Sequence, residues 1–519
     1  MTDLPPAATS LAFLKNQPRG LGVLFFTEMW ERFSYYGMRS LLIFYLTQHF
    51  LFTDAQSYTI YGSYTALVYM SPLIGGVIAD RVTGARRAVA LGAVLLAFGH
   101  FTMALEGPPA SAVLDNGVRI VSREGSHLPL FFLALSLIVA GEGFLKANIS
   151  TMVGRLYGPD DPRRDTGFTL FYLGINLGAF AATLLCGYLG QVYGWRYGFG
   201  VAGIGMLIGL VVFWFGTRTL EGIGEPPDPA FLAKAVVGPL NVQHLVYGAA
   251  LAMVAAAWGL LQAPDLVSGA LGVCCVGAAL ALVAYAIVSC PREVRDRLLV
   301  AVILMVFTVV FWALFEQGGS SLSLFTARNV DRQVLGVTLQ AAQLASLNPL
   351  FIMLLAIPFA WMWHMLARRG MDLAAPYKFA LGIAQVGIGY FVLVLGTTLA
   401  GANAQVALAF LVGAYFFHTT GELCLSPIGL SAVTKLAPPQ IVGFAMGAAF
   451  LSIAAAQLIA AALAKTAALA PVASTGMGSA AGLEAYQHLF MLLGWIALGA
   501  AALLGVLSPF LKRMMHGLN

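Results

Sequence analysis

Charged residues recur within the first long apolar run of the chain, at a spacing suited to binding an ion or a charged ligand. Glu28, Glu31, Arg32 and Arg39 lie inside that run, and Tyr35 completes the series. Separations of three, four, seven and eleven residues place all five positions on one side of a helix. A glutamate that gains or loses a cationic neighbour can take up and release a proton. The stripe is therefore a candidate proton-binding site.

The composition indicates which environment surrounds this helix. Of the 519 residues, 59% are hydrophobic and 10% are charged, whereas soluble domains have roughly 45–50% apolar and 25% charged residues. The chain is therefore predicted to be a membrane protein. A charge at the centre of a membrane helix costs about 2.5–3.5 kcal/mol on insertion scales, so the charges of the stripe must face a polar interior rather than lipid.

Long apolar runs are predicted to form fourteen membrane-spanning helices, because a helix needs about 20 apolar residues to cross the hydrocarbon. Their approximate ranges are 21–50, 58–82, 87–106, 128–157, 166–193, 196–217, 243–262, 266–289, 298–327, 336–369, 377–399, 404–436, 440–470 and 486–511. The seventh and eighth runs contain no Asp, Glu, Lys or Arg. We interpret them as a pair inserted between two six-helix halves.

The predicted fold class is thus an all-α polytopic membrane protein with six, two and six helices in its three parts. The expected boundaries are 1–220 for the N-terminal bundle, 221–297 for the linker and inserted pair, and 298–519 for the C-terminal bundle. Most Lys and Arg residues of the loops fall on the side shared by both termini. The positive-inside rule therefore predicts that both termini are cytoplasmic.

Several other classes of protein lack support in the sequence. The basic residues are scattered over short loops without a patch, which argues against nucleic-acid binding. The five cysteines are odd in number and show neither metal-ligand nor disulfide spacing. No combination of nucleophile, base and metal ligands indicates an enzyme, so neither a metal site nor catalytic residues are expected.

Further polar groups occur inside other predicted spans of both halves. They are Glu142, Lys146, Asn176, Glu316, Asn348 and Glu422. So many intramembrane ionisable groups usually mark a substrate or ion pathway, and a cavity lined from both halves is predicted. The alternative, open for any single pair, is that these charges form structural ion pairs that hold helices together.

Five short motifs carry a resemblance to a known family. The segment "EMWERFSYYG" (28–37) resembles the E-x-x-E-R-F-x-Y-Y-G signature of the proton-dependent oligopeptide transporter family, a branch of the major facilitator superfamily. Similar matches are "GGVIADRVTGARR" (75–87), "FYLGINLGA" (171–179), "FWALFEQ" (311–317) and "SLNPLF" (346–351). The resemblance covers essentially the whole chain. It implies the major facilitator fold, the additional helix pair of bacterial members, and location in the bacterial inner membrane.

The resemblance also implies roles for individual residues. Proton movement would be coupled to peptide movement through Glu28, Glu31, Arg32 and Glu316. Residues implied to contact the substrate are Arg32 and Lys146 at the peptide carboxylate, Glu422 at its ammonium group, Asn176 and Asn348 at its backbone and ends, and Tyr35, Tyr36, Tyr69 and Trp312 around its side chains. Arg39 with Glu316 would form the outer gate, and Lys146 with Glu422 the inner gate.

The chain departs from the family pattern at several positions. Ala147 replaces the proline of the fourth-helix motif, and Ala179 replaces the serine that closes the fifth-helix motif. Ala449 stands where many members have tryptophan, which would widen a side-chain pocket. The second span lacks the histidine of animal members, so its proton role must fall to glutamates. The role of Glu142 stays open.

We therefore expect a proton-coupled symporter that imports di- and tripeptides by alternating access. Its driving force would be the proton gradient, without a cofactor. The expected partners are peptides, protons and membrane lipid, and a monomer is expected. One alternative is a transporter of another small organic anion or a peptide-like drug on the same scaffold. Another, from a different class, is a membrane receptor that does not transport.

Overall fold

The computed structural model describes residues 17–116, 118–158, 160–371, 373–401, 403–468 and 479–518. The first sixteen residues and the last two of the thirteenth predicted span lie outside the described residues. Within the described part, helices form nearly all of the structure. The all-α prediction is confirmed.

The helices follow the predicted spans closely. The first six are α2 (Arg19–Phe44), α3 (Asp54–Ile78), α4 (Gly84–Ala104), α5 (Leu128–Arg155), α6 (Arg164–Val192) and α7 (Trp195–Gly216). The short α8 (Pro229–Ala233) precedes α9 (Val242–Leu261) and α10 (Pro264–Ser289). The remaining helices are α11 (Arg292–Phe315), α12 (Ser321–Asn329), α13 (Leu347–Arg368), α14 (Ala375–Thr398), α15 (Leu408–Leu436), α16 (Val442–Ala468) and α17 (Ala480–Met514).

Short strands and irregular turns occur where these helices end. Strands β1 (Ser111–Asp115) and β2 (Val118–Ser122) form an antiparallel hairpin. The other strands are β3 (Ala235–Val237), β4 (Leu240–Asn241), β5 (Val330–Asp331), β6 (Gln333–Val334), β7 (Val337–Thr338) and β8 (Val406–Ala407). Turns of π-helix extend α2 over Tyr45–His49 and α3 over Ala79–Thr83, and 3₁₀ turns cover Thr217–Leu220, Glu316–Gly319 and Ala341–Ser346. None of the strands was predicted.

Twelve continuous helical segments of the described residues are long and apolar enough to cross a membrane. One of them, Asp54–Ala104, has 51 residues and contains both α3 and α4, which meet at Gly84. Gly84 has φ +72°, and a Cβ atom there would lie 2.5 Å from backbone atoms of Glu225, so a glycine is required at this turn. The charged helix α2 is too polar for the same criterion. When α3 and α4 are counted separately and α2 is added, the twelve segments become fourteen spans, and the prediction is confirmed.

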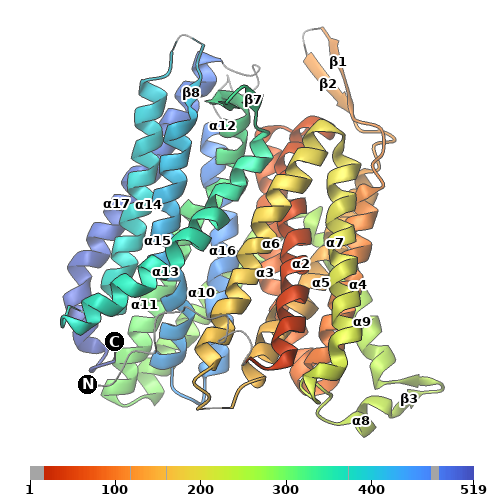
Figure 1. Ribbon diagram of the computed structural model, residues 1–519, viewed down its shortest axis with the longest axis vertical. Helices are drawn as coiled ribbons and strands as arrows, with labels where there is room; N and C mark the ends of the chain where they lie inside the picture. Colours follow the sequence, from red (N-terminus) through yellow and green to blue (C-terminus); the bar gives the residue numbers. More distant parts are fainter. Residues whose placement is uncertain are drawn as a thin grey trace.

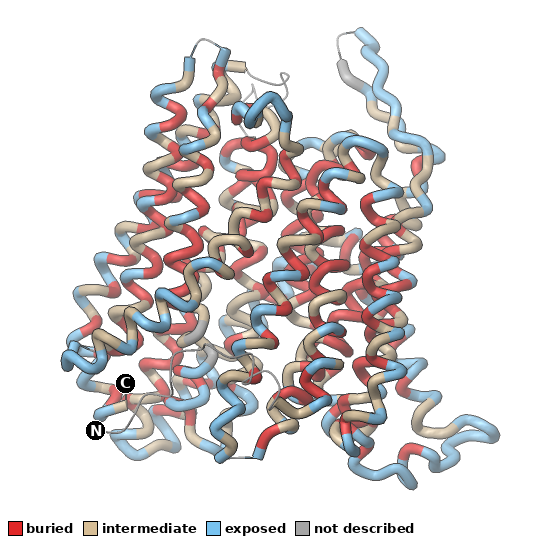
Figure 2. The backbone as a smooth tube through the Cα atoms, viewed as in Figure 1, coloured by how far each residue is buried: buried red, intermediate tan, exposed pale blue. Residues whose placement is uncertain are grey.

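The helices form two groups that stand side by side in Figure 1. Helices α2 and α4 to α7 pack mainly on one another, as do most of α11 to α17, whereas α3 packs more on α16 of the second group than on any helix of its own. Helix α2 begins and α17 ends at one end of the bundle, which we call the terminal end. The β1–β2 hairpin projects from the opposite end, which we call the hairpin end. Figure 2 shows buried residues concentrated along the facing sides of the helices.

The inserted helices separate rather than forming a tight pair. Helix α9 packs on α5 of the first group, whereas α10 packs on α11 and α16 of the second. The Trp258 indole of α9 donates a hydrogen bond to the Pro129 carbonyl at 3.2 Å, and the Cys275 thiol of α10 donates to the Leu451 carbonyl at 3.3 Å. Each inserted helix is thus attached to a different half.

The ninth predicted span is broken near its hairpin end. Helix α11 ends at Phe315, the 3₁₀ turn covers Glu316 to Gly319, and α12 begins after Ser320. The Gln317 amide donates to the carbonyls of Ala313 at 3.2 Å and Ala460 at 2.9 Å, so its side chain ties the break to α16. Gly319 lies so close to the Tyr61 hydroxyl that a Cβ atom would be 1.9 Å from it. The break therefore brings the backbone around Glu316 against the first half.

We predict that Gly178→Leu destabilises the protein. A Cβ at Gly178 of α6 would lie 2.2 Å from the Met29 carbonyl of α2, so a larger side chain must push these helices apart. Overpacking of this kind costs about 1–3 kcal/mol. Thermal unfolding in detergent should show a lowered midpoint. Gly272→Leu on α10 is the matched control, because nothing lies within 4 Å of that position; equal midpoints for the two variants would contradict the prediction.

Candidate functional site

The charged stripe of α2 forms a buried ion cluster. The Arg32 Nε lies 2.7 Å from a Glu28 carboxylate oxygen and 2.8 Å from a Glu31 carboxylate oxygen. All three residues are at most 5% exposed. Burial of several charges is tolerable when opposite charges lie in contact. The sequence-based expectation that these groups point into the protein is thus met by the geometry.

Helix α5 places two further ionisable groups next to this cluster. Glu142 is fully buried, and its carboxyl group interacts electrostatically with Glu31, Arg32 and Lys146. The Lys146 ammonium lies 4.1 Å from the centre of the Tyr69 ring and 5.8 Å from that of Tyr35. Cation–π contacts of this kind stabilise an ammonium group without neutralising it. Lys146 is held by aromatic rings on the first half.

The predicted contact between Lys146 and Glu422 is not formed in this structure. Glu422, on α15, instead accepts a hydrogen bond of 2.9 Å from the Asn348 amide. The same amide donates to the Thr419 hydroxyl at 3.1 Å. The second half thus holds its own carboxylate through Asn348. The roles of Lys146 and Glu422 as an inner gate stay a prediction.

Two ion pairs join the halves toward the hairpin end. Arg39 of α2 forms an ion pair with Glu316, and its Nε also donates to the Tyr61 hydroxyl at 2.7 Å. Arg328 at the end of α12 binds both oxygens of Asp54, at 2.5 and 2.8 Å. A bidentate guanidinium–carboxylate pair is among the stronger polar contacts in proteins. The Arg39–Glu316 contact was predicted, whereas the Arg328–Asp54 pair was not.

Ion pairs toward the terminal end, among the described residues, do not join the halves. Arg86 pairs with Glu225 of the linker, and Arg155 lies 3.7 Å from Asp80 within the first half. Within the second half, Arg297 pairs with Glu293 at 2.5 Å. The polar links between the halves are therefore concentrated at the hairpin end. The structure represents a conformation that is closed there.

A central cavity of about 1150 Å³, counted with its opening, lies between the halves. Its lining includes eight of the residues singled out from the sequence, which are Tyr36, Arg39, Tyr69, Asn176, Trp312, Glu316, Asn348 and Glu422. Glu28, Glu31, Arg32, Tyr35 and Lys146 do not line it and lie in the adjoining cluster. Tyr69 connects the two regions, because it lines the cavity and the Lys146 ammonium lies over its ring.

Other lining residues were not predicted. Tyr61, Tyr172, Tyr415 and His418 contribute polar groups to the wall. Tyr172 belongs to the quoted motif "FYLGINLGA", so its position four residues before Asn176 was the available signal. The other three occur in apolar runs, where a lone tyrosine or histidine usually indicates only packing.

A smaller apolar pocket adjoins the central cavity at Trp312. Its volume, counted with its opening, is about 450 Å³, and it shares Trp312 and Ser426 with the larger cavity. Its remaining lining residues are Met305, Thr308, Leu425, Gly429, Val433, Ala449 and Ile453. The small side chain of Ala449 leaves this space open. A bulky apolar group of a ligand in the central cavity can therefore extend past Trp312.

The charged groups in and near the cavity come from both halves. No cluster of three or more His, Cys, Asp or Glu side chains suited to a metal occurs in the part of the chain that the structure describes. Carboxylates of Glu316 and Glu422 lie on the wall of the second half, and Arg39 lies on that of the first. Arg32 and Lys146 add positive charge behind that wall. Arg39 and Glu316 are paired with each other, which leaves the Glu422 carboxylate on one wall and the Lys146 ammonium behind the other as the groups that can attract the two ends of a short ligand.

Comparisons with known proteins agree with this architecture. Residues 86–482 match the family model described as "POT family". Dipeptide and tripeptide permease A of Erwinia pyrifoliae is 34% identical over 98% of this chain and 97% of that protein. A crystal structure of peptide transporter POT in complex with sulfate is 35% identical, with a TM-score of 0.80 over 96% of both chains. A mutant of peptide transporter POT in complex with alafosfalin is 36% identical, with a TM-score of 0.80 and the same coverage.

We predict that removing the Asp54–Arg328 pair loosens the hairpin end. The double variant Asp54→Asn with Arg328→Gln removes both charges, so neither is left unpaired. A loss of about 1 kcal/mol would raise the fraction of molecules open at this end about fivefold. Pulsed electron paramagnetic resonance between spin labels at Glu124 and Leu335, both exposed, should show a larger population at long distances.

The control for this measurement is a pair of exposed residues on α17. Glu484 and His488 lie 3.7 Å apart and are mostly solvent-exposed, so Glu484→Gln with His488→Gln should leave the distance distribution unchanged. Both experiments use a background in which the native cysteines are replaced. An unchanged distribution in the Asp54 and Arg328 double variant would show that this pair does not hold the halves together.

Proposed function

The chain belongs to the POT family, and we propose that it is a proton-coupled symporter that imports di- and tripeptides. Similarity to dipeptide and tripeptide permeases extends over almost the entire chain, and the fold is that of solved peptide transporters. The observation that carries the proposal is the central cavity, because its walls come from both halves, with the Glu422 carboxylate on one wall and the Lys146 ammonium behind Tyr69 of the other. A short peptide has a charge at each end and fits this arrangement.

The substrate would bridge the two halves of the cavity. Glu422 would receive the peptide ammonium group, and Arg32 and Lys146 its terminal carboxylate. Asn176 and Asn348 present amides from opposite walls to the peptide backbone and ends. Because Lys146 is paired with rings rather than with a carboxylate in this conformation, its charge is available to a bound anion. Tyr36, Tyr69 and Trp312 surround the space that remains for side chains.

Alternating access would result from exchange of the contacts between the halves. The hairpin-end pairs Arg39–Glu316 and Arg328–Asp54 are formed here. In the opposite state, these pairs would open while Lys146 and Glu422 approach each other at the inner gate. Glu316 would contribute to coupling, because a proton on its carboxyl group weakens its attraction to Arg39. A proton entering from outside would thus favour opening of the hairpin end.

The membrane arrangement is part of the same proposal. We place the terminal end in the cytoplasm of a bacterial cell, the hairpin end outside the inner membrane, and the functional unit as a monomer. The halves 1–220 and 298–519 would move about the cavity, with 221–297 joining them. A proton that crosses a potential of 100 mV contributes about 2.3 kcal/mol, which is sufficient to concentrate a peptide without another cofactor.

The first test is uptake of labelled dialanine into proteoliposomes with an inside-negative and inside-alkaline gradient. We expect accumulation that a proton ionophore abolishes. Accumulation of another organic anion or a peptide-like drug in place of dialanine would identify a different substrate on the same scaffold. Peptide binding to folded protein without any uptake would indicate a receptor and contradict the proposal.

We predict that Glu31→Gln separates proton coupling from substrate exchange. The neutral amide cannot release a proton, yet its size preserves the packing of this buried position. Gradient-driven dialanine uptake should fall to the level of protein-free liposomes, while exchange of labelled for unlabelled dialanine across the membrane should continue. Glu484→Gln, at an exposed position, is the control and should behave as the wild type. Normal gradient-driven accumulation by Glu31→Gln would exclude the assigned role.

We predict that Ala449→Trp narrows substrate preference. A tryptophan ring would fill the apolar pocket beside Trp312, so a peptide with a phenylalanine side chain would lose burial worth about 1.5–3 kcal/mol. Competition assays should show about a tenfold or greater loss of affinity for such a peptide, with little change for dialanine. Phe444→Trp, at an exposed position of α16, is the control. Equal losses for both peptides would contradict the assignment of the pocket.

A further inference from the structure

Glu142 has no role in the transport cycle described so far, although it is among the most completely buried charged residues. Its exposed fraction is 0%, and neither carboxyl oxygen has a hydrogen-bond partner among the described residues. Such groups are rare, because an unpaired buried charge is strongly unfavourable. The ionisable groups that face it are Glu31, Arg32 and Tyr35 from α2, Tyr64 from α3, His100 from α4 and Lys146 from α5.

The carboxyl groups of Glu31 and Glu142 are both fully buried and close enough to interact directly, and none of their four oxygens receives a hydrogen bond from another described residue. An ionised carboxylate can only accept hydrogen bonds, so two ionised groups cannot bond to each other. Two carboxylates that share a buried site therefore favour a state in which one proton lies between them. Because no donor group among the described residues compensates both buried carboxylates at this place, a proton on the pair is the arrangement that the burial favours.

The surrounding charges support the same conclusion. Three carboxyl groups, those of Glu28, Glu31 and Glu142, meet two cations, Arg32 and Lys146. Arg32 already contacts Glu28 and Glu31, and the Lys146 ammonium lies over the Tyr69 ring. One proton on the carboxyl pair balances the charge of the group, which avoids an excess negative charge in the interior.

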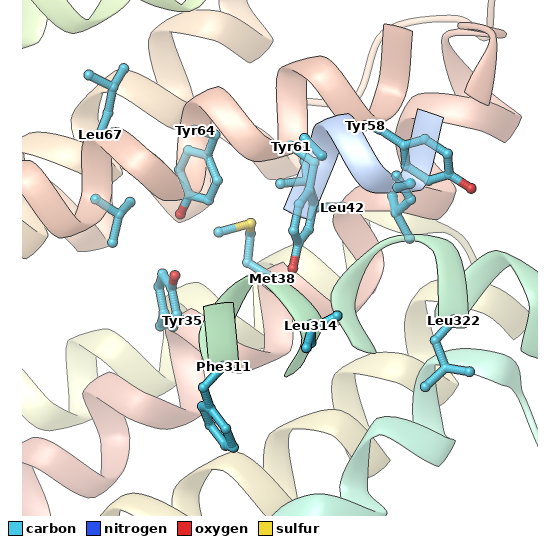
Figure 3. Close-up of a cluster of buried hydrophobic side chains, with 14 of the residues drawn as sticks. Tyr35, Met38, Leu42, Tyr58, Tyr61, Tyr64, Leu67, Phe311, Leu314 and Leu322 are labelled. Atoms are coloured by element: carbon cyan, nitrogen blue, oxygen red, sulfur yellow. The ribbon is translucent and has the colours of Figure 1, made fainter. Parts of the chain in front are cut away.

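The other polar groups that face Glu142 do not supply a compensating charge. The hydroxyls of Tyr35 and Tyr64 are directed toward each other across the space between α2 and α3 (Figure 3), and neither has a hydrogen-bond partner among the described residues. His100 is fully buried, and both of its ring nitrogens are also unpartnered. These groups can donate or accept hydrogen bonds as the proton moves, but none forms an ion pair with Glu142.

We propose that Glu31 and Glu142 share one transported proton, so that Glu142 is a second proton-binding residue of the coupling site. This inference rests on the proposed function. While the proton is bound, the pair carries one negative charge instead of two, so it attracts Arg32 and Lys146 less strongly and leaves them able to bind the peptide carboxylate. When the O–H bond breaks and the proton passes to water at the terminal end, the two carboxylates attract both cations. Release of the proton thereby weakens binding of the peptide.

The test is the pH dependence of gradient-driven dialanine uptake by Glu142→Gln. Glutamine removes the neighbouring negative charge and can donate a hydrogen bond to ionised Glu31, so Glu31 should bind its proton less tightly. The midpoint of uptake should move to more acidic external pH by about one unit or more. Glu142→Asp retains a carboxyl group, and its midpoint should lie closer to that of the wild type.

The control is Glu484→Gln, which neutralises an exposed glutamate and should leave the midpoint unchanged. A midpoint for Glu142→Gln equal to that of the wild type would overturn the proposal. Infrared spectroscopy of the wild-type protein provides a second test, which stays valid even if a variant fails to fold. A protonated carboxyl band at neutral pH is expected, and absence of this band would also overturn the proposal.

Together, the uptake and infrared measurements distinguish failure of the proposed transport function from failure of the shared-proton proposal. If the wild type shows no proton-driven uptake of dialanine, the proposed function fails, whereas the infrared band still reports on the carboxyl pair. If uptake is normal and the band is absent, the shared proton is excluded while the transport function stands.

Discussion

Burial of the Arg32 guanidinium is the interaction on which the surrounding structure depends. A cation on a membrane helix needs opposite charge within direct contact, and Glu28 and Glu31 supply it from the same helix. Two carboxylates and one guanidinium leave one excess negative charge, which a cation on a neighbouring helix can balance. Helix α5 supplies this cation as Lys146, but it also adds the buried carboxyl group of Glu142, which restores the excess negative charge. The first half is consequently organised around a charge imbalance that a proton and a substrate carboxylate can change.

Much of the fold follows from the sequence because the membrane imposes lengths and polarity on the helices. Apolar runs of adequate length identify all fourteen spans, and the spacing of Glu28 to Arg39 identifies the polar side of the first one. The β1–β2 hairpin was missed, although Asn116 and Gly117 between alternating apolar residues are a typical hairpin signal. The break after Phe315 was missed as well, because its position depends on contacts of Gln317 and Gly319 with other helices.

The site was only partly predictable for a different reason. The spacing of residues along one helix shows which of them share a face. An ion pair between the two halves leaves no such pattern in the sequence, because its partners belong to distant segments. Asp54 and Arg328 are 274 positions apart and each occurs near the end of a helix, so each resembles an ordinary loop charge. Arg39 and Glu316 were paired only because family motifs contain both. The Lys146–Glu422 contact depends on conformation, and a sequence does not specify which conformation a single structure adopts.

The break between α11 and α12 divides the two residues that the second half contributes to the closed end. Glu316 lies at the start of the 3₁₀ turn, and Arg328 lies in the last turn of the nine-residue helix α12. The Glu316 backbone N–H still donates to the Trp312 carbonyl, so Glu316 belongs to α11 and the cavity wall, whereas Arg328 lies beyond the break. Tilting of α12 at Ser320 would separate Arg328 from Asp54 while Glu316 stays with α11, so the two ion pairs of the closed end can open one after the other. The substrate-binding wall would not need to bend.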